Sequence, residues 1–246
     1  MKIVVIGGTG LIGSKVVARL GERGHEAVPA SPRTGVNTLT GEGVKEALHD
    51  ANVVVDVSNS PSFQDDDVME FFRTSTSNLL DAAGAAGVGH YVALSVVGAD
   101  RLPESGYLRA KVAQEELIAA STLPYSIVRA TQFFEFAGQI ADSATADGEV
   151  RLSGGAVQPM AAEDVAAAVG GTAAGAPVNG IAEVAGPEVF GLDRWIGTVL
   201  AARHDPRTVI TDPQARYFGA LPDRELLPGP GASLARTRLS DWLTRQ

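Results

Sequence analysis

The chain has 246 residues, a formal net charge of −9 and no cysteine, with 45% hydrophobic and 20% charged residues. A chain of this length corresponds to one or two domains and buries a sizeable core without disulfides. The lack of cysteine excludes disulfides, thiolate catalysis, iron–sulfur clusters and thiolate zinc sites. The negative charge argues against a nucleic-acid partner, because phosphate binding needs clustered Lys and Arg.

The sequence contains no recognisable targeting or membrane-spanning segment. The N-terminal run MKIVVIGG has one Lys and reaches glycines after a short apolar stretch, unlike a secretory signal. The longest uncharged stretch, Ala82–Ala99, is interrupted by Gly84, Gly87, Gly89, His90 and Ser95. It therefore favours a helix end, a turn and a buried strand over a membrane span. We expect a cytoplasmic protein that has no membrane partner.

Strand-like and helix-like segments alternate over the first 130 residues. The apolar, β-branched runs predicted as strands are Lys2–Ile6, Glu26–Ala30, Asn52–Val57, His90–Ser95 and Tyr125–Arg129. The Ala- and Leu-rich stretches predicted as helices are Gly10–Arg23, Glu42–Leu48, Asp65–Ala86 and Leu108–Ala120. Strands without hydrophobic–polar alternation are buried on both faces, which is typical of parallel sheets covered by helices. The repeated order predicts an α/β fold with a Rossmann-type doubly wound parallel sheet.

The pattern is less regular after residue 131. The elements predicted there are helices Phe133–Ser143, Glu163–Ala174 and Leu234–Leu243 and strands Glu149–Leu152, Val157–Met160 and Ala182–Val184. The segment 186–246 is otherwise expected to be irregular. Its Pro- and Gly-rich stretch Leu221–Gly231 predicts an ordered loop. The last helix places four apolar residues on one face that should dock on the body, namely Ala235, Leu239, Trp242 and Leu243.

A glycine-rich turn follows the first strand. Gly8, Gly10 and Gly13 satisfy the pattern GxGxxG, and Gly7, Gly10 and Gly13 satisfy the pattern GxxGxxG. The turn opens an amphipathic helix in a βαβ unit, which is the context that a dinucleotide-binding turn requires. Glycine lets the backbone approach a pyrophosphate, and free N–H groups at the helix start bind its charge. The predicted cofactor contacts in this turn are Gly7, Thr9, Gly10, Leu11, Ile12 and Gly13.

The end of the second strand indicates which cofactor binds. A site for NAD places Asp or Glu there to accept hydrogen bonds from the ribose 2′-hydroxyl. This chain has Ser31 and Arg33 instead. Ser31 can donate to a 2′-phosphate and Arg33 can bind it with two N–H groups, so NADP(H) is favoured over NAD(H). The alternative is that Arg33 is a solvated loop charge.

Four features together resemble a known group of proteins. They are the GGTGLIG turn, Arg33 after the second strand, the YLRAK run from Tyr107 to Lys111, and the RATQFF run that begins at Arg129. They resemble extended, atypical short-chain dehydrogenase/reductases, most closely their NmrA-like NAD(P)-binding branch. The resemblance covers residues 1–185. It implies a cofactor across the carboxyl ends of the strands, in a nicotinamide-dependent reductase, an epimerase or a non-catalytic cofactor sensor.

The resemblance also implies catalytic roles for three residues. Tyr107 and Lys111 match the family's YxxxK pair, one helical turn apart, and Ser95 matches its serine at the end of the preceding strand. Tyr107 would protonate the oxyanion left by hydride addition, helped by a nearby ammonium that lowers its pKa. Lys111 would supply that charge and hold the nicotinamide ribose. Ser95 would polarise the substrate carbonyl.

Two further groups of residues follow carboxyl ends of strands. Ser58 and Asn59 end the third strand, where the resemblance implies backbone contact with the cofactor ribose. Gln132, Phe133 and Phe134 follow the fifth strand and are candidates to line the substrate or nicotinamide pocket. The alternative for these aromatic residues is that they belong to the core.

The remaining patterns do not indicate a metalloenzyme or a serine hydrolase. None of the four histidines forms a pair at metal-ligand spacing, and GxSxG does not occur. We therefore predict one NAD(P)-binding domain over residues 1–246, in which residues 131–246 form the smaller substrate-binding part. The expected activity is NADPH-dependent reduction of a small carbonyl or quinone-like molecule. A cofactor sensor without turnover and an epimerase or isomerase remain alternatives, and a homodimer is left open.

Overall fold

The computed structural model describes residues 1–245. Its centre is a seven-stranded sheet in the order β12-β9-β5-β4-β3-β1-β2, and every pair in it is parallel. The strands are β1 (Lys2–Ile6), β2 (Glu26–Ala30), β3 (Val53–Asp56), β4 (His90–Val96), β5 (Tyr125–Ala130), β9 (Gly180–Ala185) and β12 (Ser233–Leu234). The predicted Rossmann-type α/β fold is confirmed. The edges of the sheet are β2, which contains Pro29, and the two-residue strand β12.

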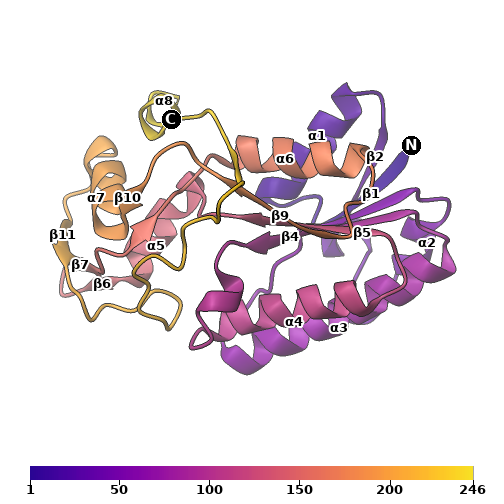
Figure 1. The fold of residues 1–246 in the computed structure, drawn as a ribbon, viewed down its shortest axis with the longest axis horizontal. Coiled ribbons are helices and arrows are strands. Elements are labelled where there is room, and N and C mark those ends of the chain that lie inside the picture. The colour runs from indigo at the N-terminus through magenta and orange to yellow at the C-terminus, as the bar shows by residue number, and fades with distance from the viewer. Residues whose placement is uncertain (246) are drawn as a thin grey trace.

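Helices cover both faces of the sheet (Figure 1). One face carries α1 (Leu11–Glu22) and α6 (Ala162–Ala174). The other carries α2 (Val44–Leu48), α3 (Asp65–Ala85) and α4 (Gly106–Ala120). The chain leaves β1 to form β2 on one side and then returns to form β3 on the other. This reversal places the ligand-binding crevice of such sheets at the carboxyl end of β1.

Strand β1 shows how the apolar runs specify this arrangement. Its residues alternate between the two faces, so Ile3 and Val5 pack with α1 and α6, whereas Val4 and Ile6 pack with the helices opposite. All four side chains are essentially inaccessible to solvent. A strand that must be apolar on both sides cannot show hydrophobic–polar alternation, which is the pattern that the sequence displays.

Residues from 131 onward form a second packed region beside the carboxyl end of the sheet (Figure 1). Its helices are α5 (Ala137–Ser143), α7 (Leu192–Ala202) and α8 (Leu239–Leu243). Its strands are β6 (Thr145–Ala146), β7 (Glu149–Leu152), β8 (Ala156–Val157), β10 (Phe190–Gly191) and β11 (Thr208–Thr211). Trp195, Phe134 and Leu200 lie in its own apolar cluster. Short 3₁₀ turns at Pro32–Thr34, Ala99–Arg101 and Phe134–Phe136 join elements of both regions.

Three expectations for this second region are wrong. The predicted helix 234–243 is helical only from Leu239, because Ser233 and Leu234 pair with β9 as β12. The segment expected to be irregular contains α7, whose Trp195, Ile196 and Val199 fill the core at helical spacing. The strand predicted at 157–160 is limited to β8, and Met160 makes an isolated bridge instead.

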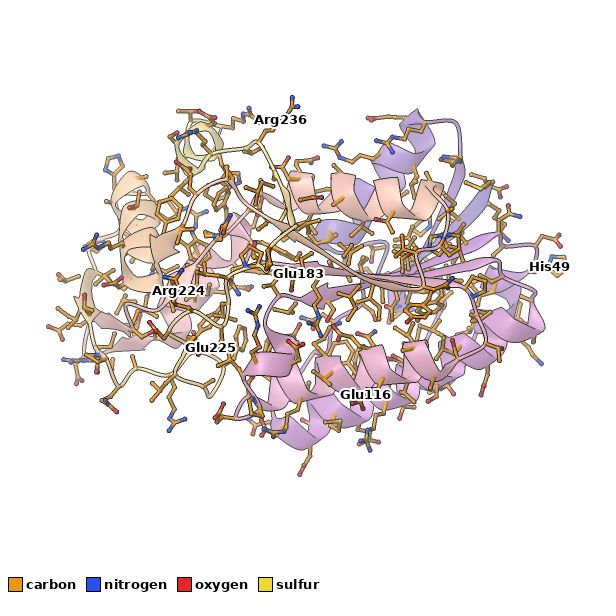
Figure 2. The ribbon with its side chains drawn as sticks, in the orientation of Figure 1. His49, Glu116, Glu183, Arg224, Glu225 and Arg236 are labelled. Atoms are coloured by element: carbon orange, nitrogen blue, oxygen red, sulfur yellow. The ribbon has the colours of Figure 1, made fainter. Side chains whose placement is uncertain are left out.

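Residues 212–232, here called the return segment, connect β11 to β12. It includes the predicted loop Leu221–Gly231, which has neither helix nor strand. Backbone groups anchor it to both regions: Ala156 donates to the Asp223 carbonyl at 2.6 Å, and Gly229 donates to Glu183 of β9 at 2.5 Å. Figure 2 labels Arg224 and Glu225 of this segment and Glu183 of β9.

The sequence predicts no membrane-spanning segment, and a span would require a helix that is both long and apolar. Within residues 1–245, each helix is too short or too polar to cross a bilayer.

Candidate cofactor and catalytic site

The glycine-rich turn lies in close contact with the carboxyl ends of β2 and β3. Gly7 has a φ of +78°, and its N–H donates to the Ala30 carbonyl at 2.8 Å. A Cβ on Gly7 would lie 2.9 Å from the Val57 carbonyl oxygen, and one on Gly13 would overlap the Gly7 carbonyl. Both positions therefore require glycine, one for its backbone conformation and both for close approach.

The first turn of α1 is open to an anion. Gly10 is the N-cap and has no side chain to accept from the first N–H groups, and the turn contains no acidic residue. These N–H groups have no acceptor within the helix, and they lie at the positive end of its dipole. Leu11 is partly exposed, whereas the Ile12 side chain is buried in the core. This cradle fits the pyrophosphate of a dinucleotide, which backbone groups alone can bind.

The end of β2 lies against the same turn. The buried Ser31 Oγ accepts a hydrogen bond from Thr9 Oγ1 at 3.0 Å. The Ser31 N–H donates to Thr34 Oγ1 at 2.9 Å, which fixes the 3₁₀ turn that carries the exposed Arg33. The two residues predicted to select NADP(H) thus share this strand end, one beside the glycine-rich turn and one facing solvent.

The loop after β3 connects the glycine-rich turn to α4. A Cβ on Gly7 would lie 3.0 Å from the Ser58 Cα, so the two backbones are in close contact. Ser58 Oγ and N–H both donate to the carboxylate of Asp56, at 2.6 and 3.0 Å. The next residue, Asn59, accepts a hydrogen bond from the Tyr107 hydroxyl at 3.1 Å. A continuous line of contacts therefore runs from the glycine-rich turn to Tyr107.

Tyr107 is the second residue of α4, one turn before Lys111. Ser105 caps the helix by accepting from the Leu108 N–H at 3.3 Å, which begins the helix two residues earlier than predicted. The Tyr107 ring meets Phe72 edge-on, with 6.1 Å between centroids. Burial raises the pKa of Tyr107 to about 12, so its hydroxyl is protonated at neutral pH.

Lys111 points into the protein, beneath α4. Its Nζ donates to the Leu94 carbonyl at 2.8 Å and to Gln114 Oε1, and lies 4.3 Å from the centre of the Phe72 ring. Burial lowers the pKa of Lys111 to about 8, although the carboxylates of Asp56 and Glu115 act in the opposite direction. The ammonium is thus held at the carboxyl end of β4, and the acceptors of its hydrogen bonds are Leu94 and Gln114 rather than Tyr107.

A layer of polar side chains, missed by the sequence interpretation, surrounds Lys111. Asp56 accepts from Gln114 Nε2 at 2.9 Å and from the Tyr91 hydroxyl at 3.2 Å. Beside it, Arg129 forms a two-pronged ion pair with Glu115 at 2.9 and 2.6 Å. We call this the polar layer, formed by Asp56, Lys111, Gln114, Glu115 and Arg129. The one available signal was a charged residue at the carboxyl end of each of two apolar strands, where Asp56 is the last residue of β3 and Arg129 the last but one of β5.

Ser95 and Gln132 are buried with an atom that has no partner. Within the described part of the chain, neither Ser95 Oγ nor Gln132 Oε1 makes a hydrogen bond. Ser95 follows Tyr91 and Ala93 at every second position of β4, so all three lie on the sheet face that packs against α3 and α4. Buried polar atoms without partners are rare, and a ligand is one reason for them to persist. Both residues fit contact with a bound molecule.

The two aromatic residues predicted beside Gln132 differ in their surroundings. Phe133 is half-buried and stacks on Phe136, with 5.4 Å between centroids. Phe134 is completely buried and packs on Trp242 in the core of the second region. The expectation that Phe134 lines the substrate pocket is corrected, because its side chain faces the core.

Two exposed aromatic side chains near Tyr107 were also missed. Phe63 from the loop after β3 and Phe218 from the return segment lie with ring centroids 5.8 and 5.4 Å from that of Tyr107. Both stand in loops without periodicity, and the sequence interpretation gave neither of them a functional role. Among residues 1–245, no group of three His, Asp or Glu side chains could hold a metal ion.

The chain is similar in sequence to an NAD(P)H-binding family and in structure to proteins solved with NAD or described as NADPH-dependent. A family described as NAD(P)H-binding matches residues 7–173. The rice (Oryza sativa subsp. indica) divinyl chlorophyllide a 8-vinyl-reductase is 32% identical over 199 residues, which are 67% of this chain and 49% of that protein. The chain spans about half the length of the curated relatives it matches.

Solved structures share the fold at low identity. MoeE5, solved with UDP-glucose and NAD, has a TM-score of 0.75 at 19% identity, with 99% of this chain and 96% of that one covered. An Escherichia coli NADPH-dependent quinone oxidoreductase (QOR2) has a TM-score of 0.70 at 16% identity, with 99% and 98% covered. With the matched family model spanning the glycine-rich turn, Tyr107 and Lys111, the chain belongs to the NAD(P)H-binding family.

Proposed function

We propose that this protein is an NADPH-dependent reductase of a small carbonyl or quinone-like substrate. The observation that carries the proposal is the line of contacts from the glycine-rich turn through Ser58 and Asn59 to the Tyr107 hydroxyl. It joins a pyrophosphate cradle to a proton donor at the carboxyl ends of the strands. The rice relative is named a reductase, and the E. coli protein of the same fold is titled an NADPH-dependent quinone oxidoreductase.

The residues of the chain divide the work of holding the cofactor. The N–H groups at the start of α1 would bind the pyrophosphate, and the loop of Ser58 and Asn59 would lie along a ribose. Ser31 and Arg33 would bind the 2′-phosphate of NADP(H), since no carboxylate stands at the end of β2 to repel it. Lys111 would turn from the Leu94 carbonyl to reach the nicotinamide ribose.

The remaining residues would handle the substrate oxygen. The chemistry that NADPH would supply here is a hydride for the carbonyl carbon, which would leave the substrate oxygen in need of a proton. Tyr107 would exchange its hydrogen bond to Asn59 for one to that oxygen and donate its proton there. Ser95, whose hydroxyl has no partner in the described residues, would hydrogen-bond the same oxygen and polarise the carbonyl. Gln132 and Phe133 would line the pocket beside it.

A cofactor sensor without turnover is the second candidate. The observation that favours it is that burial raises the pKa of Tyr107 to about 12, while the Lys111 ammonium is directed elsewhere. A stronger acid would suit proton donation better. A sensor needs the pyrophosphate cradle but no proton donor.

The experiment follows NADPH absorbance with the full chain against a panel of quinones, ketones and aldehydes. Tyr107→Phe should lower turnover at least about tenfold while NADPH affinity changes little, since one proton donor is removed. Tyr125→Phe, at the opposite end of the sheet, is the control and should keep full turnover. Titration with both cofactors should show tighter binding of NADPH than of NADH.

Three outcomes separate the possibilities. Unchanged turnover in Tyr107→Phe removes this residue from the mechanism. Inactivity across the whole panel, with NADPH binding retained, favours the sensor. Equal affinity for NADH and NADPH contradicts the roles given to Ser31 and Arg33.

A further inference from the structure

The ring of Tyr107 packs with two aromatic rings that belong to loops. Phe218 stacks on Tyr107, with centroids 5.4 Å apart and planes 20° apart. Phe63 lies 5.8 Å from Tyr107 and 5.9 Å from Phe218. We call these three residues the aromatic cluster. They come from α4, from the loop after β3 and from the return segment, so tertiary folding alone brings them together.

Phe218 reaches this place through a turn that its residue type disfavours. Tyr217 and Ala220 exchange backbone hydrogen bonds at 2.8 and 3.1 Å, and a φ of +49° at Phe218 and of +81° at Gly219 lie between them. This is the geometry of a type I′ turn, whose first central position is normally Asn, Asp or Gly. A bulky residue with positive φ is an outlier, and such outliers cluster at ligand-binding and catalytic sites.

The two phenylalanines of the cluster are not part of an apolar core. Phe63 is 58% exposed and Phe218 is 42% exposed, so large parts of both rings face solvent. Neither residue belongs to the apolar clusters that stabilise the sheet or the second region. Core packing therefore does not explain why the strained turn carries a phenylalanine.

We propose that Phe63 and Phe218 are specificity-determining residues that bind the flat, conjugated ring of the substrate beside Tyr107. This inference rests on the proposed function and narrows its substrate class to aromatic or quinone-type rings. Exposed ring faces favour a planar partner, because offset stacking adds to the apolar area that is buried. The Tyr107 hydroxyl, which donates to Asn59 Oδ1, is the polar group of the cluster. This donor suits a neutral ring that carries one oxygen able to accept a hydrogen bond.

The test measures binding as well as turnover. Calorimetry on the full chain with NADP⁺ present compares 2-naphthol, which is flat and cannot be reduced by hydride, with cyclohexanol. In parallel, NADPH oxidation gives the KM for 1,4-naphthoquinone. The variant is Phe218→Asn, since Asn is compatible with the turn. Its matched control is Leu221→Asn, which removes an apolar side chain of similar exposure, 41%, from the same segment.

Phe218→Asn should weaken 2-naphthol binding and raise the naphthoquinone KM by about 2- to 10-fold, the range for one lost aromatic pair. Cyclohexanol binding and NADPH affinity should stay close to those of the parent protein. The urea midpoint should change little, because relief of strain in the turn opposes the loss of the ring contact. Phe218→Tyr keeps the ring and should retain the parent affinity for 2-naphthol.

Failure of this inference can be told from failure of the proposed function. If naphthoquinone is reduced and Phe218→Asn leaves its KM unchanged, the ring-binding role is overturned and the reductase stands. The role is also overturned if Leu221→Asn weakens 2-naphthol binding as much. If no substrate is reduced but Phe218→Asn still weakens 2-naphthol binding selectively, the ring site stands and the reductase is rejected.

Discussion

The two faces of the central sheet differ in chemistry. The face under α1 and α6 is apolar at its centre, with Val5, Val55 and Val92 in one continuous cluster, and its buried polar pair His90–Ser126 lies at the amino ends of β4 and β5. On the opposite face, the carboxyl ends of the strands carry Asp56, Ser95 and Arg129 beneath α4. Both faces therefore carry an apolar cluster, but the second also carries charged side chains at low dielectric. Interactions between such charges are strong, and the loss of one partner is costly.

This difference separates two tasks of the fold. Apolar packing between α1 and β1 on the first face fixes the position of the glycine-rich turn that joins them. The polar face places titratable groups near the proposed site of reaction, where burial changes the pKa of Tyr107 and Lys111. Substitutions on the two faces should therefore fail in different ways, which the following predictions exploit.

The largest expected effect is on the polar face. Glu115→Gln leaves the buried Arg129 guanidinium facing only the half-exposed Asp100, 3.0 Å away. Breaking a buried ion pair by removing one partner costs about 3–5 kcal/mol of unfolding free energy. On the opposite face, Glu163→Gln removes an exposed partner of Lys15 and should cost about 0–1 kcal/mol. Urea unfolding of both variants measures the contrast, and equal losses would contradict it.

A smaller effect is expected from filling the apolar face. A Cβ in Gly13→Ala would overlap the Gly7 carbonyl, and overpacking of this kind costs about 1–3 kcal/mol. Because the overlap displaces the turn itself, NADPH affinity should fall as well. Gly21→Ala in the same helix is the matched control. No atom lies within 4 Å of its new Cβ, and it should stabilise by about 0.5–1 kcal/mol. If Gly21→Ala lowered the unfolding free energy, helix propensity would not determine the stability change at this open position.

The smallest expected effect is a pH dependence that arises from Lys111. Its pKa is about 8 in the folded protein against 10.5 ordinarily, so between these values the unfolded chain binds the extra proton. The unfolding free energy should therefore rise with pH, by at most about 1.4 kcal/mol per pH unit. Urea midpoints at pH 8 to 10 should climb less steeply in Lys111→Met. Tyr107 contributes with the opposite sign near pH 10, because its pKa of about 12 exceeds the ordinary value of 10, but this contribution is common to both proteins and cancels when their slopes are compared. Identical slopes would exclude Lys111 as the source.

The sequence predicted the first half of the fold closely. β1, β2 and the start of α3 lie at the predicted residues, because strands buried on both faces and a long amphipathic helix leave clear patterns. The glycine-rich turn and the spacing of Tyr107 and Lys111 were also visible, since local geometry requires these residue types.

The rest depended on contacts between distant residues. β12 forms because Ser233 and Leu234 meet the free edge of β9, which no local pattern announces. The direction of the Lys111 side chain depends on Gln114 and on the Leu94 carbonyl, and the place of Phe218 depends on a turn that its residue type disfavours. These features arise from tertiary packing that overrides local preference, so spacing alone could not predict them.

The two edges of the sheet carry a consequence for assembly. A free strand edge is a template for pairing with another chain, and proteins blunt it with proline or with very short strands. In the described residues, one edge is β2, interrupted by Pro29, and the other is the two-residue β12. Neither offers a long run of backbone groups to a second copy. Joining two copies into one continuous sheet is therefore disfavoured, and self-association would have to use helices or loops.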